Sequence, residues 1–126
     1  MERIYFADHK GRRILVLDLS RLSAEETPPL LRGFRGLVAT QPPGKTLLVL
    51  VNAKGNRFNP ESVEEMKQVS KANEPRVLAT AMVGMSKLGS IIARQVYQAA
   101  GRKYEAFDDM AAAMDWLSQQ NPPKKT

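Results

Sequence analysis

The stretch from residue 76 to residue 101 constrains the fold of this chain more than any other. Residues 77–83 (VLATAMV) are apolar or small at all but one position, which is typical of a strand covered on both faces. Gly84 ends this run, and the hydroxyl of Ser86 can cap a helix that follows. Gly101 stands where a left-handed terminating residue is expected. A buried strand, a turn and a helix in this order predict an α/β protein with a mostly parallel sheet.

Apolar side chains recur at helical spacing along this predicted helix and indicate an amphipathic element. The stripe consists of Leu88, Ile91, Ile92, Val96 and Ala99, with Gln95 as a polar interruption. A stripe of this kind is what a surface helix presents to the core of a globular domain. We therefore expect these side chains to pack inward.

Strand and helix patterns alternate along the rest of the chain. Residues 3–6 and 13–19 predict two strands of an antiparallel hairpin. The other expected elements are strands over 46–51 and 102–107 and helices that begin with Thr27 and Pro28, with Asn59 and Pro60, and with Asp108 as cap. The order ββαβαβαβα predicts a mixed, mostly parallel five-stranded sheet with about four helices. Residues 1–120 would form a single domain and residues 121–126 a disordered polar tail.

Composition excludes several classes of protein. The chain has 126 residues, no cysteine and one histidine, His9, so thiolate sites, multi-histidine metal sites and cysteine nucleophiles are excluded. No apolar run approaches the ~20 residues of a membrane span, and the start MERIYFADHK lacks a signal-peptide core, so a cytoplasmic protein is expected. The net charge of +6 raises the question of nucleic acid. Since basic and acidic residues are interleaved, a nucleic-acid partner is not expected.

Polar residues gather where the predicted parallel strands end, the edge at which α/β proteins tend to bind ligands. Because such loops are polar whether or not they bind anything, a plain solvated turn is the alternative interpretation. No nucleophile with an adjacent base can be assembled, so we expect no catalytic residue, metal, cofactor or enzymatic activity. The candidate binding residues are Asp18 and Ser20, then Asn52, Lys54, Asn56 and Arg57, and finally Ser86 and Lys87, where a helix start could also hold an anion.

Two long strings of the sequence resemble a known family. They are LLVLVNAKGNRF (47–58) and VLATAMVGMSKLGSIIARQVYQAAGRKYEAFDDMAAAMDWL (77–117), and the likeness extends over about residues 13–118. Both are similar to the small bacterial SpoIIAA-like proteins, whose STAS-like fold is that of anti-sigma-factor antagonists and has also been related to the CRAL-TRIO lipid carriers. The resemblance implies a STAS-like domain that binds a partner rather than converting a substrate.

The same resemblance points to a switch serine. Anti-sigma-factor antagonists are phosphorylated at the start of the helix after the second parallel strand, where this chain has Asn59, Pro60, Glu61 and Ser62. The acidic residue and the serine of the usual motif are replaced, and Ser62 falls inside the first turn. A phosphate is electrostatically tolerable near a helix N-terminus, so Ser62 is the candidate phosphorylation site.

Three functional hypotheses remain open. The first is a regulatory module that recognises a protein partner through residues 52–62 and the start of the helix at Ser86. The second is a carrier of an acyl chain or anionic metabolite in the same crevice. The third is an oligomer-forming domain, a homodimer by default, in which Trp116 and Tyr97 partly face a second subunit. In the carrier, the methionines Met66, Met82, Met85, Met110 and Met114 would form an adaptable apolar wall, although filling of the core explains them too.

Overall fold

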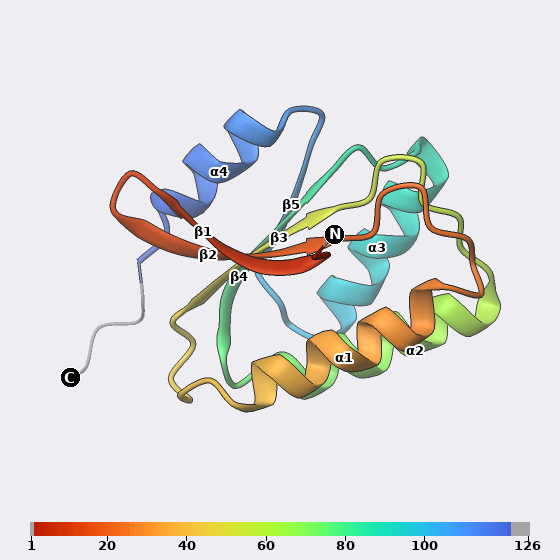
Figure 1. Cartoon of the computed structure of the whole chain (residues 1–126), viewed down its shortest axis with the longest axis horizontal. Coiled ribbons are helices and arrows are strands. Elements are labelled where there is room, and N and C mark those ends of the chain that lie inside the picture. Colours follow the sequence, from red (N-terminus) through yellow and green to blue (C-terminus); the bar gives the residue numbers. More distant parts are fainter. Residues whose placement is uncertain (1, 122–126) are drawn as a thin grey trace.

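The computed structural model describes residues 2–121 and contains one five-stranded sheet and four helices (Figure 1). The order ββαβαβαβα and the mixed, mostly parallel sheet are as the sequence predicts. Of the predicted tail, all but Asn121 lies outside the described residues. No helix in this part of the chain has the length and apolar character needed to cross a membrane. The elements are β1 (Ile4–His9), β2 (Arg12–Asp18), α1 (Thr27–Ala39), β3 (Leu47–Asn52), α2 (Pro60–Asn73), β4 (Val77–Val83), α3 (Lys87–Ala99), β5 (Tyr104–Phe107) and α4 (Met110–Ser118).

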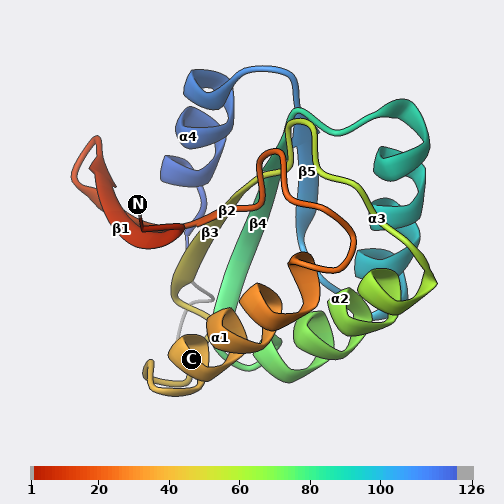
Figure 2. The same ribbon diagram turned by 45° about the vertical axis from the view of Figure 1, so that its right-hand side comes forward.

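The central strands are buried on both faces. Helices α1, α2 and α3 lie on one side of the sheet and α4 on the other (Figure 2). Successive residues of a strand face opposite sides of the sheet. In β2, Leu15 and Leu17 pack toward α1 with Phe34. Ile14 and Val16 pack toward α4 with Leu117. This two-sided burial is why the strands are continuous apolar runs rather than alternating ones.

The strands lie side by side in their sequence order, β1-β2-β3-β4-β5. Only β1 is antiparallel to its neighbour, and the three crossover helices all lie on one face (Figure 1). The strand order therefore never reverses, and a reversal is what opens the ligand crevice of doubly wound sheets. The carboxyl edge of this sheet is instead bordered by closely packed loops.

Two predicted helix starts are confirmed. Asn59 caps α2, where its side chain accepts the Ser62 N–H at 2.8 Å. Ser86 caps α3, where its hydroxyl accepts the Gly89 N–H at 3.0 Å. Both satisfy a backbone donor that a helix start otherwise leaves without a partner.

Two other predicted caps are wrong by one residue. The residue before α1 is Glu26, which makes no side-chain cap, while Thr27 donates its hydroxyl to the Ser23 carbonyl at 2.8 Å. Helix α4 is capped by Asp109 rather than Asp108. Asp108 and Asp109 have the same capping ability, so only the backbone conformation, which tertiary packing sets, selects between them.

Helix α3 buries a different face from the predicted one. Its buried residues are Gly89, Ala93, Val96 and Tyr97, whereas Leu88 is 61% exposed and Ile91 50% exposed. Space beside Gly89 is tight: a Cβ there would lie 3.0 Å from the Ser86 hydroxyl, 3.3 Å from the Met85 methyl and 3.5 Å from the Phe58 ring. Most of the predicted stripe lies on the surface instead.

Candidate functional site

Four of the eight predicted binding residues meet at the carboxyl ends of β2 and β3. They line an open recess of about 400 Å³ together with two arginines that the sequence pattern does not indicate. We call it the carboxyl-edge recess, and its residues are Arg3, Asp18, Ser20, Arg21, Asn52 and Lys54.

Arg3 and Asp18 form the ordered side of this recess. The Arg3 guanidinium donates to the carbonyls of Asp18 at 3.1 Å and Ser20 at 3.0 Å, and lies 3.8 Å from the Asp18 carboxylate. Asp18 in turn accepts the Ser20 N–H at 2.9 Å. The charge of the single carboxylate in the recess therefore has a partner. Arg3 was missed because only the pairing of β1 with β2, which sets Ile4 opposite Leu17, brings it there.

Arg21 and Lys54 form the open side. Arg21 has φ of +61° and donates its N–H to the Lys54 carbonyl at 2.9 Å, which joins the β2–α1 loop to the β3–α2 loop. Both side chains are exposed, and neither has an ion-pair partner within residues 2–121. A left-handed arginine costs about 1–2 kcal/mol, so loop contacts must hold it, and such strain often accompanies function.

Asn56 and Arg57, the two other predicted binding residues of the β3–α2 loop, do not line the recess. The Asn56 amide donates to the carbonyls of Leu19 at 3.1 Å and Leu22 at 3.4 Å and to the Thr27 hydroxyl at 3.0 Å. Asn56 therefore ties this loop to the start of α1 and is not available to a ligand. The Arg57 side chain is exposed, and its backbone N–H donates to the Leu22 carbonyl at 3.0 Å.

Ser86 and Lys87 lie apart from the carboxyl-edge recess. They line a second open hollow, beside α3, with Ile91, Arg94 and Asp108 among its other residues. The Ser86 hydroxyl already accepts the Gly89 N–H. The two predicted halves of the binding surface are thus separate in space.

Ser62 is a helix-capping residue in this structure. It is fully buried, its hydroxyl accepts the Asn59 N–H at 2.9 Å, and it donates to the Asn59 carbonyl at 3.0 Å. With the Asn59 side chain bonded to the Ser62 N–H, the pair forms a reciprocal capping box. A kinase would have to open the first turn of α2 to reach this hydroxyl, so the folded state does not favour phosphorylation there.

The single histidine lies at the opposite edge of the sheet. His9 ends β1, and its Nε2 is 2.7 Å from Oδ1 of Asp115 on α4. The hydrogen bond from His9, followed by that from Lys10, holds the pKa of Asp115 below its ordinary value. This contact joins the hairpin to α4 and is distant from the carboxyl-edge recess.

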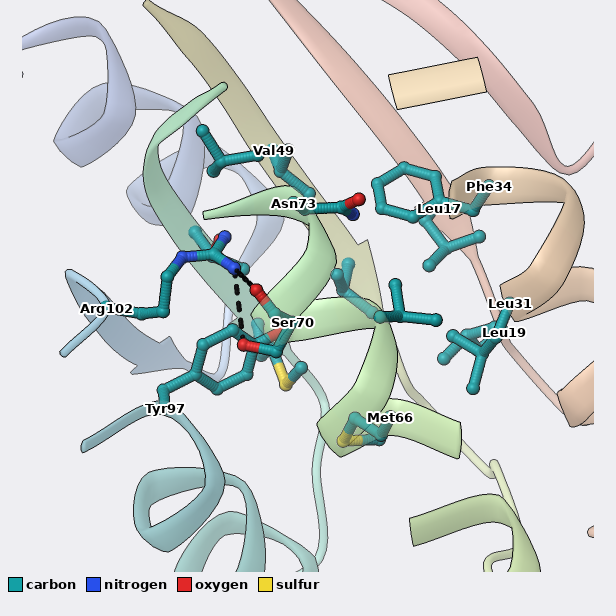
Figure 3. A pocket seen from close by; sticks show the side chains of 15 residues that line it. Leu17, Leu19, Leu31, Phe34, Val49, Met66, Ser70, Asn73, Tyr97 and Arg102 are labelled. Atoms are coloured by element: carbon teal, nitrogen blue, oxygen red, sulfur yellow. Dashed lines mark hydrogen bonds between the residues drawn. The ribbon is translucent and has the colours of Figure 1, made fainter. Parts of the chain in front are cut away.

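A partly buried arginine lies beneath α2 (Figure 3). Arg102 donates to the Ser70 carbonyl and, at 3.2 Å in each case, to the hydroxyls of Ser70 and Thr80. Its guanidinium lies 5.5 Å from the ring centre of Tyr97, which stacks on Tyr104 at 4.8 Å. Burial lowers the pKa of Arg102. No carboxylate within residues 2–121 forms an ion pair with it, so oxygen dipoles and the Tyr97 ring stabilise the cation.

The interior offers little room for a ligand. The cavity beside Arg102 and a neighbouring one are each about 20 Å³, the space of roughly one water molecule. The five methionines do not share a wall, because Met66, Met82 and Met85 pack toward α1–α3 while Met110 and Met114 pack toward α4. An acyl chain bound between the sheet and the helices would require the core to open.

Because the Tyr97 hydroxyl is buried, we expect the protein to lose stability at alkaline pH. Burial raises its pKa from 10.0 to about 12, so between these values the unfolded chain releases a proton that the folded chain keeps. The free energy of unfolding should then fall with rising pH, by about 2–3 kcal/mol in total across this window. Urea unfolding at a series of pH values should show a shallower fall for Tyr97→Phe. Parallel profiles for the two proteins would contradict this origin.

Comparison with known proteins identifies the fold. No family model and no curated protein sequence matches the chain. A solved structure of an uncharacterised DUF3478-family protein from Shewanella loihica PV-4, described as having a SpoIIAA-like fold, matches with a TM-score of 0.70. The identity is 14%, over 90% of this chain and 91% of that chain. The SpoIIAA-like fold predicted from the sequence is confirmed.

Proposed function

We propose that this SpoIIAA-like domain is a non-catalytic binding module that recognises an acidic segment of a protein partner through the carboxyl-edge recess. The observation that carries the proposal is the charge of the recess. Arg3 offsets Asp18, and this leaves Arg21 and Lys54 exposed at the centre of two joined loops. Paired cations on a surface of this kind attract acidic partners and select against basic ones.

The backbone beneath these two cations favours binding. The Arg21–Lys54 hydrogen bond and the packing of Gly55 against Arg21 join the β2–α1 and β3–α2 loops, and Gly84 of the β4–α3 loop packs against Lys54. A surface that is ordered before binding loses less conformational entropy when the partner arrives. The water-sized interior cavities give the acyl-carrier hypothesis no comparable support.

The test is quantitative affinity capture with charge-matched variants. The double variant Arg21→Ala with Lys54→Ala should capture at least tenfold less of a partner that the wild type captures. Arg35→Ala combined with Lys103→Ala removes the same charge from two exposed positions elsewhere and should retain it. Circular dichroism would show that both variants fold, and added salt should weaken capture. Equal capture by all three proteins would refute the proposed surface.

A further inference from the structure

The outer face of α3 exposes large apolar side chains. Within the described chain, the large hydrophobic residues that are exposed are Tyr5, Leu88 and Ile91, and the last two lie three positions apart on α3. Residues at this spacing are neighbours on a helix surface. Solvent-exposed apolar side chains that adjoin one another on a helix commonly mark an interaction surface.

A groove runs beside this face, between α2 and α3. It has a volume of about 810 Å³ and is open to solvent. Its apolar lining consists of Val63 of α2, Ile92, Val96 and Ala99 of α3, and Ala100 just after α3. Leu88 lies one helical turn from Ile92, and Ile91 lies beside it in sequence, so the exposed residues adjoin the groove along α3.

Cations border this apolar surface on both sides. Lys67 and Lys71 of α2 line the groove, and Lys87 and Arg94 line the hollow on the other side of α3. The carboxylate that lines the groove is Glu74, which is already paired with Lys45 at 2.5 Å. The surface is apolar at its centre apart from Gln95, and its margins are net positive, with Asp108 as the other carboxylate among the lining residues.

This pattern distinguishes between the occupants that an apolar groove can have. A second copy in symmetric contact would bring the cationic margins of the two copies together, which is unfavourable. A lipid surface is flat and would leave the groove between the helices unfilled. A helix with one apolar face fills such a groove, and acidic residues beside that face would meet the four cations.

We infer that the α2–α3 groove is a docking site for an acidic amphipathic helix of a partner protein. The apolar face of that helix lies against Ile92, Val96 and Ala99, and Leu88 and Ile91 extend the contact along α3. Its acidic flanks meet Lys67 and Lys71 on one side. This site is separate from the carboxyl-edge recess, so either surface can bind without the other.

The experiment uses two fluorescent synthetic peptides of about 20 residues, long enough for a stable amphipathic helix. Both carry leucines at the same positions; one has glutamates beside the leucine face and the other has lysines. Fluorescence anisotropy with the full chain should show at least tenfold tighter binding of the acidic peptide. The double variants Leu88→Gln with Ile91→Gln, and Lys67→Glu with Lys71→Glu, should each weaken that binding at least tenfold.

The matched control distinguishes the α2–α3 groove from a general effect of charge. Arg35→Glu with Lys103→Glu changes the net charge by the same amount at two exposed positions outside the groove and the recess, and it should bind the acidic peptide as the wild type does. Failure of the acidic peptide to bind, or equal binding of both peptides, would overturn the inference. It would also be overturned if the Leu88/Ile91 variant abolished self-association in sedimentation velocity or binding to phosphatidylcholine–phosphatidylglycerol vesicles, since the occupant would then be a second copy or a membrane.

Discussion

Gly84→Ala is expected to lower the free energy of unfolding by about 2–4 kcal/mol. Gly84 has φ of +76°, a conformation that costs a residue with a Cβ about 1–2 kcal/mol. The new methyl would also lie 2.9 Å from Cβ and 3.1 Å from Cα of Lys54. Since these atoms belong to the adjacent loop rather than to a flexible side-chain end, the backbone must shift. Urea unfolding monitored by circular dichroism would measure the loss.

Gly101→Ala is the matched control for this substitution. Gly101 has φ of +65°, but a Cβ there would meet no atom within 4 Å. The free energy of unfolding of this variant should fall only by the conformational cost of about 1–2 kcal/mol. The difference between the two variants then measures the contact between the loops that carry Gly84 and Lys54. Equal losses would mean that this contact does not constrain the carboxyl edge.

Arg102→Met is expected to destabilise the fold by about 2–4 kcal/mol. Methionine keeps most of the apolar stem but leaves the Ser70 carbonyl and the Thr80 hydroxyl without their buried donor. It also removes the cation beside Tyr97. These groups join the last turns of α2 to β4, so amide hydrogen exchange should increase first in that region.

The neighbouring residue provides the control for Arg102. Lys103 is exposed, and Lys103→Met should change the free energy of unfolding by no more than about 0.5 kcal/mol. An Arg102→Met protein as stable as the wild type would show that desolvation of the guanidinium cancels its hydrogen bonds, as it does in many buried ion pairs. The cation would then contribute specificity of packing rather than stability.

The fold was predictable because its signals are local. The run 77–83 matches β4 residue for residue and is buried at every position except Leu78, which is partly buried, and the cap residues Asn59 and Ser86 begin α2 and α3. Each signal depends on residues close together in the chain, where a polar cap or an apolar run has few structural alternatives. The neighbouring acids Asp108 and Asp109 show the limit, because both can cap and only the packed backbone selects one.

The candidate site was predictable only in part. Asp18, Ser20, Asn52 and Lys54 were expected at the strand ends and do meet there. Arg3 and Arg21 were not expected, because strand pairing places the first and a left-handed backbone places the second.

The sequence by itself determined the order of the elements, their approximate limits and the continuous burial of the central strands. Apolar runs and caps act over a few residues, so they need no tertiary contact to be recognised. Only the tertiary structure decided which face of α3 is buried. The side that carries the small residues Gly89 and Ala93 is buried, and Leu88 and Ile91 remain exposed. Packing depends on the shape of the surface opposite, which periodicity along one helix does not contain.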